Sequence, residues 1–194
     1  MSRSKPILVA VLFVVLVGLV AFFLRTGVTE SLRGTPGAPA PGTAAEGSAP
    51  ERPLKKVTLF FPRELDGLLA PEEREIPADA SPVREAEEAV AELVKGPRGD
   101  LIAPIPPEAR LVRLFITRDG TAYADFNREL AEKHPSGTEA EMATVYSIVQ
   151  SLTFNFPSIK RVFLLIDGEE RETLSGHITL DHPFRPDSLL VVRR

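Results

Sequence analysis

An uninterrupted apolar run at residues 6–24, PILVAVLFVVLVGLVAFFL, constrains this chain of 194 residues more than any other feature. As a helix rising 1.5 Å per residue, the run would be about 28 Å long, which is enough to cross the hydrocarbon core of a bilayer. Arg3 and Lys5 precede the run and Arg25 follows it. The positive-inside rule then keeps the N-terminus in the cytoplasm and exports everything after Arg25. We therefore expect residues 1–25 to be a single-pass anchor in the cytoplasmic membrane, with an extracytoplasmic globular domain.

A cleaved secretory signal is the alternative interpretation of this run. Signal peptides have an apolar core of roughly 7–15 residues, followed by an A-x-A-like cleavage site. The apolar core here is longer, and the first A-x-A match after it, Ala38-Pro39-Ala40, lies far downstream and is followed by Pro41. An uncleaved anchor is therefore the favoured interpretation.

The segment at residues 26–55 is rich in Gly, Ala, Pro and Ser and contains almost nothing to bury. Such a composition cannot offset the entropy of ordering, so it predicts a disordered linker that holds the next domain away from the membrane. The remaining residues, 56–194, are long enough for one ordinary domain.

Composition excludes several functions for the domain. The chain has no cysteine, which rules out disulfides, thiolate nucleophiles, cysteine-based zinc sites and a lipidated cysteine. Residues 1–56 carry 7 Lys and Arg against 3 Asp and Glu, whereas residues 57–194 carry 16 against 24, so net charges of +4 and −8 make up the total of −4. Nucleic-acid affinity depends on Lys and Arg that displace counterions, so we expect no nucleic-acid partner for this acidic domain.

Strand signals occur at several places in the domain. A β-branched and aromatic run at residues 56–61 predicts the first strand, and the twenty residues after it are interpreted as an exposed excursion. Alternating runs at 112–117 and 121–126 flank Asp119-Gly120, which predicts a hairpin with a type I′ turn. Residues 160–166 are apolar enough for a central strand. The inward-facing residues of the hairpin are expected to be Val112, Leu114, Ile116, Ala122, Ala124 and Phe126.

Two amphipathic helices are also predicted. The first follows Ser81-Pro82, an N-cap and a first-turn proline, and ends at Gly96-Pro97. The second begins at Thr138, whose capping box Glu141 would complete, and Pro157 closes it. The pattern predicts an α+β fold, a mostly antiparallel sheet with two main helices packed on one face. The acids of the first helix are expected to form a solvated face; they are Glu85, Glu87, Glu88 and Glu92.

A loop with three prolines at residues 101–109, LIAPIPPEA, is too rich in proline for a regular helix or strand. A stiff loop of this kind can present a binding surface at low entropic cost, or it can cover an open edge of the sheet. We take four of its residues as a candidate binding loop, namely Pro104, Ile105, Pro106 and Pro107.

Catalytic and cofactor-binding motifs are missing from the sequence: it contains no G-x-S-x-G elbow, phosphate loop, dinucleotide-binding glycine pattern or H-E-x-x-H. His177, Asp181 and His182 are close in sequence, but the two histidines of an extended segment with this spacing point to opposite faces. Asp125 is expected to point outward and cap a short helical turn. We therefore predict no catalytic residues, no metal site and no cofactor.

Five motifs in order resemble a GerMN domain, the module named for the GerM sporulation and germination protein. They are TLFFP, LVKGP, IPPEARL, YADFN and SIVQSLTFNFPSIKRVFLLIDG, and the resemblance runs from about Val57 to Leu180. The resemblance implies a small mixed α/β domain in an exported, membrane-attached protein. It also implies structural hallmark residues, here Gly96, Pro97, Asp125, Phe126, Pro157, Asp167 and Gly168.

The resemblance further implies a non-catalytic role in assembly of the cell envelope or the spore. GerM-type proteins look like lipoproteins with two copies of the module, whereas this chain has one copy and a predicted transmembrane anchor. We expect a non-enzymatic module that binds an envelope protein partner through sheet edges or the proline loop. A domain that binds peptidoglycan or another wall polymer is the alternative, and a hydrolase is a remote one.

Overall fold

The computed structural model describes residues 53–193. The predicted anchor at residues 1–25 and nearly all of the predicted linker lie outside this range. None of the helices within the described range has the length and apolar character needed to cross a membrane.

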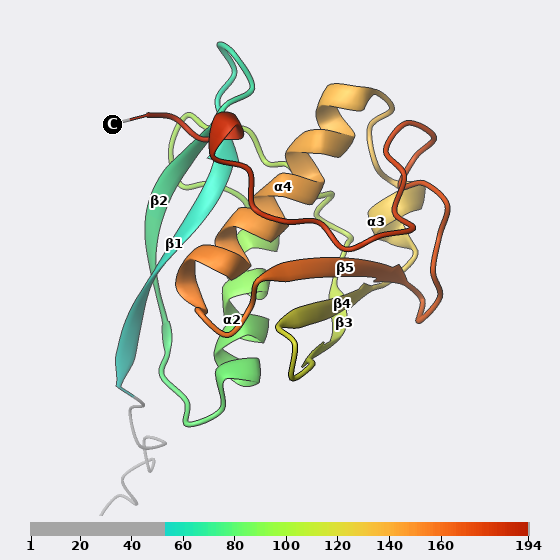
Figure 1. The fold of residues 1–194 in the computed structure, drawn as a ribbon. Helices are drawn as coiled ribbons and strands as arrows, with labels where there is room; N and C mark the ends of the chain where they lie inside the picture. The colour runs from blue at the N-terminus through green and yellow to red at the C-terminus, as the bar shows by residue number, and fades with distance from the viewer. Residues whose placement is uncertain (1–52, 194) are drawn as a thin grey trace, which may run out of the picture. The chain divides into compact units, whose positions relative to one another are not determined.

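A two-stranded antiparallel sheet opens the domain (Figure 1). It pairs β1 (Leu54–Pro62) with β2 (Leu69–Pro77) along the full length of both strands. The prediction that the twenty residues after the first strand form an exposed loop is therefore wrong, because about half of them form β2. Acids and prolines fill the outward positions of β2, and one inward position holds a buried arginine, Arg74, instead of an apolar residue. An alternating hydrophobic pattern is consequently hard to see in the sequence.

A three-stranded sheet lies on the other side of the helices, in the order β3-β4-β5. Its strands are β3 (Leu111–Ile116), β4 (Thr121–Phe126) and β5 (Arg161–Ile166). β3 and β4 are antiparallel, but β4 and β5 are parallel, because the chain crosses over through α3 (Glu129–Glu132) and α4 (Thr138–Asn155). β5 was predicted to be central, and this is wrong: β4 is central, while β5 is covered by two backbone hydrogen bonds between Val162 and Phe184, of 2.9 and 2.7 Å.

Two helices pack between the sheets. α2 (Pro82–Val94) contacts β2, β3 and α4, and α4 contacts β1 and β5. The α+β class is confirmed, but the single sheet covered on one face is replaced by two sheets with the helices between them (Figure 1). The buried side chains that fill this interior come from all these layers; the largest include Phe61, Leu93, Phe126, Ile148 and Leu164. After β5 the chain is mostly irregular up to the short 3₁₀ helix η1 (Ser188–Leu190).

The hairpin of β3 and β4 is confirmed, but its turn differs from the prediction. Gly120 is left-handed (φ +86°) and Asp119 is not, and the Gly120 N–H donates to the Thr117 carbonyl at 3.0 Å. This is a type I turn followed by a glycine bulge and not a type I′ turn. A second irregularity lies between Leu111 and Arg113, where Val112 has no partner on β4. Val112 is consequently 56% exposed and does not face inward as predicted.

Candidate functional site

The proline loop packs into the domain at its middle and at Ala109. Pro104, Ile105 and Pro106 are buried, and Pro107 alone of the four candidate residues is exposed. The Thr144 hydroxyl of α4 donates to the Pro104 carbonyl, which fixes the loop to the helix. A hollow of about 350 Å³ remains along the loop. A binding role for these residues stays a prediction, and their burial supports a packing role.

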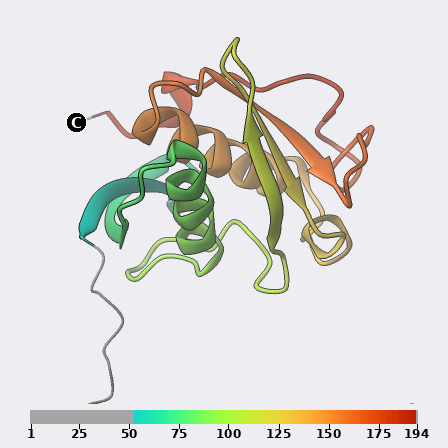
Figure 2. The ribbon, with the colours of Figure 1, turned by 90° about the horizontal axis from the view of Figure 1, so that it is seen from below.

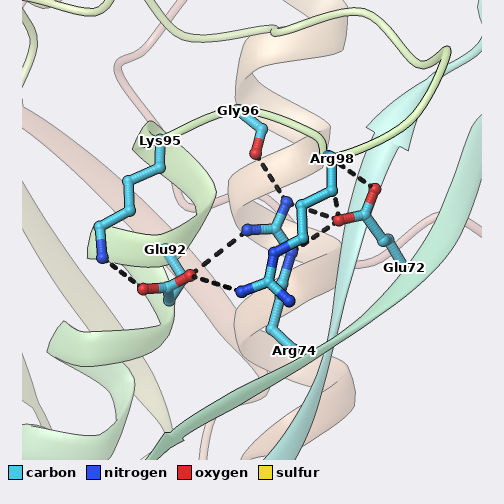
Figure 3. Close-up of polar contacts among 6 residues, drawn as sticks. All are labelled: Glu72, Arg74, Glu92, Lys95, Gly96 and Arg98. Carbon is cyan, nitrogen blue, oxygen red and sulfur yellow. Dashed lines mark hydrogen bonds and ion pairs between the residues drawn. The ribbon is translucent and has the colours of Figure 1, made fainter.

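The hallmark residue Gly96 belongs to a buried charge cluster that joins α2 to β2 (Figure 3). Arg74, whose side chain is 3% exposed, donates from Nη2 to the Gly96 carbonyl at 2.8 Å and from Nε to Glu72 at 2.6 Å. Its Nη1 lies 3.3 Å from Glu92. Burial alone would raise the pKa of Glu92, but its bonds to Lys95 and Arg74 outweigh burial and hold that pKa below its usual value.

Steric constraints explain why residue 96 is a glycine. Its φ of +80° is left-handed, as expected just after a helix, and a Cβ there would lie 3.3 Å from the Cβ of Ala103. The following Pro97 stops any continuation of α2. The second hallmark proline, Pro157, is exposed and comes shortly after the end of α4. These residues end helices and are not grouped into a site.

The other hallmark residues meet where β4 and β5 end. Asp125 is 2% exposed and accepts hydrogen bonds from the Gly168 N–H at 2.7 Å and from Arg113 Nη2 at 2.8 Å. The Asp167 N–H donates to the Phe126 carbonyl at 2.8 Å. Asp125 thus lies on the outer face of the sheet with Tyr123, as its alternation predicted, but it is buried there, and the prediction that it caps a helical turn is wrong. Its carboxylate ties the end of β4 to the turn after β5, which is a structural role.

Asp167 has the role that was predicted for Asp125. Its Oδ1 accepts from the Arg128 N–H at 3.1 Å, at the start of α3. Asp167 (φ +52°) and Gly168 (φ +80°) are both left-handed, as expected for an Asp-Gly turn.

The acids of α2 do not form one solvated face. Glu85 is 8% exposed and pairs with Lys55 Nζ at 2.5 Å, and this hydrogen bond lowers the pKa of Glu85. Glu92 belongs to the Arg74 cluster, whereas Glu88 is exposed as expected. Half of the predicted solvated face therefore consists of paired carboxylates that hold α2 in place.

The histidines and Asp181 do not converge. His182 Nδ1 lies 2.8 Å from Asp181, while His177 Nδ1 lies 2.9 Å from Glu141. Within residues 53–193, no group of three or more His, Asp or Glu side chains is placed to hold a metal ion. Glu141, predicted to complete a capping box, is instead fully buried and accepts from the N–H groups of His177 and Ile178 at 3.2 and 2.8 Å.

The outer edge of β3 is the candidate interaction site. β3 is the last strand of its sheet, and in the described part of the chain no other segment forms backbone hydrogen bonds with its outer side. The Thr117 N–H donates to the Thr121 carbonyl at 2.9 Å. Because hydrogen-bonded pairs alternate along an antiparallel ladder, the backbone groups of Leu114 and Ile116 point away from β4. They are free to bind another strand.

Exposed apolar side chains line this edge. Val112 is 56% exposed and Phe115 is 49% exposed. α2 packs beside β3 (Figure 2). A groove of about 460 Å³ is lined by residues of α2 and of the start of β3. Ala91 and Val94 contribute apolar surface to the groove, and its other lining residues are Glu87, Glu88, Ala109, Arg110, Leu111 and Val112.

An aromatic row crosses the outer face of the same sheet. The ring of Phe115 stacks on Tyr123 with centroids 4.7 Å apart, and Tyr123 stacks on Phe163 at 5.4 Å. At these separations nearly parallel rings face one another, so their faces are already in contact. The outer face of Phe115 is left at the edge of the row, on β3.

Comparisons with known proteins identify the domain type. A family model described as Germane, sporulation and spore germination, matches residues 58–172. The first GerMN domain of the sporulation protein GerM from Bacillus subtilis is similar in structure, with a TM-score of 0.53 and 26% identity over 72% of this chain and 98% of that chain. The tandem GerMN domains of the same protein give a TM-score of 0.52 and 26% identity over 70% of this chain. This chain covers 46% of that tandem structure, which corresponds to one copy of the domain. No curated protein matches the chain.

Proposed function

Because the chain belongs to the Germane family, as its five sequence motifs predicted, we propose that it is a non-enzymatic module of the cell envelope that binds a protein partner through the edge of β3. The predicted anchor at residues 6–24 would hold the module at the extracytoplasmic face of the membrane. The observation that carries the proposal is the combination of an open strand edge with exposed Val112 and Phe115 beside a groove.

The open edge favours a partner that adds an extended segment. Proteins normally protect sheet edges with charges, prolines or short strands, because unpaired backbone groups attract other strands. A segment added beside β3 would bind the outward N–H and carbonyl groups of Leu114 and Ile116. Its side chains would contact Val112 and Phe115, and one of them would enter the groove next to α2.

A wall polymer is less well supported by this surface. A sugar ring would need the face of an aromatic ring. Tyr123 lies between two rings of the row and covers one face of Phe163, so the row offers mainly the outer face of Phe115. Phe163 is also only 7% exposed. The aromatic row therefore stabilises the sheet, and the edge of β3 presents Phe115 to a partner.

Site-specific photocrosslinking in native membranes tests the proposal. A photoreactive residue at position 112 of the full chain is expected to trap a discrete neighbour. The same residue at position 154 is the matched control, because Phe154 is 63% exposed but lies at the end of α4, where it contacts Phe60 of β1. Phe115→Glu should lower the yield of the position-112 adduct at least about tenfold, because it places a charge in an apolar contact.

Two results would contradict the proposal: identical adducts from positions 112 and 154, or an adduct at 112 that Phe115→Glu leaves unchanged. Sedimentation of the full chain with purified peptidoglycan, without any discrete protein adduct, would favour the wall-polymer alternative. Deletion of the proline loop is unsuitable as a test, because Ile105 and Ala109 are buried in the core.

A further inference from the structure

A second groove lies at the end of the domain that carries the turn between β1 and β2. Figure 1 shows this turn, η1 and the first half of α4 at the same end of the molecule. The groove has a volume of about 530 Å³. It shares no lining residue with the groove beside β3. Its apolar surface comes from all three segments, namely Leu65, Leu68, Met142, Ala143, Tyr146 and Leu190.

The charged residues that line this groove are all acidic. Glu64 and Glu139 line it and are exposed, and no lysine or arginine is among its lining residues. Asp66 is paired with Arg63, but within residues 53–193 neither Glu64 nor Glu139 forms an ion pair. The groove therefore combines an apolar floor with uncompensated negative charge at its rim.

Two further features fit this description. Leu65, at the tip of the turn, is 89% exposed and extends the apolar lining of the groove toward solvent. Burial and the nearby negative charge of Asp187 raise the pKa of Tyr146, so the Tyr146 hydroxyl stays protonated and can donate a hydrogen bond. Asp187 thus adds to the negative potential near the groove.

From this charge complementarity we propose that the groove is a second docking site, which takes a segment of a partner protein with an apolar side chain flanked by Lys or Arg. The apolar side chain would lie against Met142, Ala143 and Tyr146, and the flanking cations would pair with Glu64 and Glu139. The site is independent of the β3 edge, so the domain could hold two partners at once. Its negative rim disfavours anionic lipid headgroups, because like charges repel.

Binding of matched synthetic peptides to the full chain in detergent tests this site. The probe is a short fluorescein-labelled peptide with a central pair of leucines flanked by lysines, and its control carries glutamates in place of the lysines. Anisotropy should show affinity for the lysine peptide at least about tenfold higher than for the glutamate peptide, and high salt should reduce this preference. Equal affinity for the two peptides would overturn the proposal.

Variants of the groove and of a distant acidic pair test where the lysine peptide binds. Glu64→Gln with Glu139→Gln should weaken lysine-peptide binding about tenfold, while Glu169→Gln with Glu170→Gln, which removes two exposed charges elsewhere, should leave it unchanged. Ala143→Trp should abolish binding by filling the groove. Equal loss in both double variants, or full binding by the Ala143→Trp variant, would overturn the site.

Other occupants would give different results. Co-sedimentation with anionic vesicles that Ala143→Trp abolishes would assign the groove to the membrane, and a concentration-dependent dimer lost in that variant would assign it to a second copy of this chain. Either result would overturn the proposal. The photo-adduct at position 112 should persist in Ala143→Trp, so failure of this site and failure of the β3 edge can be told apart.

Discussion

Replacing Arg74 with alanine is expected to lower the free energy of unfolding by about 3–5 kcal/mol, because it leaves buried charges without their partner. Arg74 is 3% exposed and contacts Glu72, Glu92 and the Gly96 carbonyl at once. Without it, two partly buried carboxylates would face each other across the gap, and the carbonyl after α2 would lose its donor. The guanidinium also lies 5.8 Å from the centre of the Phe61 ring, so its removal opens a space in the core.

Urea unfolding of the full chain followed by far-UV circular dichroism measures this loss. Arg84→Ala is the control, because Arg84 is an exposed arginine on α2, the helix that Arg74 holds to β2, and its effect should stay within about 0.5 kcal/mol. Adding Glu72→Gln and Glu92→Gln to Arg74→Met should recover part of the loss, because that triple variant buries no unpaired charge. A loss below about 1 kcal/mol in Arg74→Ala would show that the cluster does not hold α2 to β2.

The same variant connects the cluster to the candidate site. Arg74 fixes the C-terminal end of α2, and Val94 at that end lines the groove beside β3. If α2 shifts, the groove changes shape while the edge of β3 remains. Arg74→Ala should therefore lower the yield of the position-112 adduct in protein that is still folded.

Local signals in the sequence were sufficient to predict several helices and strands. Ser81 does cap α2, since its side chain accepts from the Arg84 N–H, and Pro82 does occupy the first turn. The hairpin of β3 and β4 and the strand β5 were also predicted close to their observed bounds. Each of these depends on residues near one another in the chain, which is why pattern and turn chemistry sufficed.

Features that depend on distant residues were not predictable in the same way. β2 was missed because its inward position 74 is a charged residue, which is stable there only through Glu72, Glu92 and Gly96. The division into two sheets depends on which strands pair, and a bulge of one residue turned Val112 outward. Consequently the hairpin could be predicted, but not that β3 would be an open edge with an exposed valine.

Neither groove could be predicted from the sequence, because each is formed by segments that are distant from one another in the chain. The groove with the acidic rim is built from the turn after β1, the first half of α4 and Leu190 near the C-terminus. No local motif marks these segments as neighbours. The proline loop, by contrast, was recognisable as stiff, but its burial depends on α4, through contacts such as the bond between Thr144 and Pro104.

Glu141→Ala is expected to cost about 3–5 kcal/mol of unfolding free energy, because it removes a buried charge that accepts several hydrogen bonds. The carboxylate is fully buried at the start of α4 and binds the N–H groups of His177 and Ile178 together with the His177 ring. These bonds hold the irregular segment that follows β5 against the helix. Amide hydrogen exchange at residues 175–180 should therefore accelerate strongly in the variant.

The pH dependence of stability provides an independent test of the hydrogen bonds that Glu141 accepts. Burial raises the pKa of Glu141, but the hydrogen bonds from Ile178 and His177 outweigh it, so the net pKa in the folded protein lies below its ordinary value of 4.5. A carboxyl group with a lowered folded pKa stabilises the protein above the unfolded pKa, and this stabilisation is lost as the pH falls through the folded pKa. The wild-type protein should therefore lose stability below about pH 4.5, and Glu141→Gln should show a smaller loss over that range.

The exposed Glu139, two residues earlier in the same helix, provides the control for this measurement. Glu139→Gln should change the unfolding free energy at neutral pH by no more than about 0.5 kcal/mol and should leave the acid-dependent loss in place. An acid-dependent loss of the same size in Glu141→Gln and in the wild type would mean that Glu141 is not the titrating group. In that case the segment at residues 175–178 would be held by the burial of Leu174 and Leu180, which are 2% and 0% exposed, and not by the carboxylate.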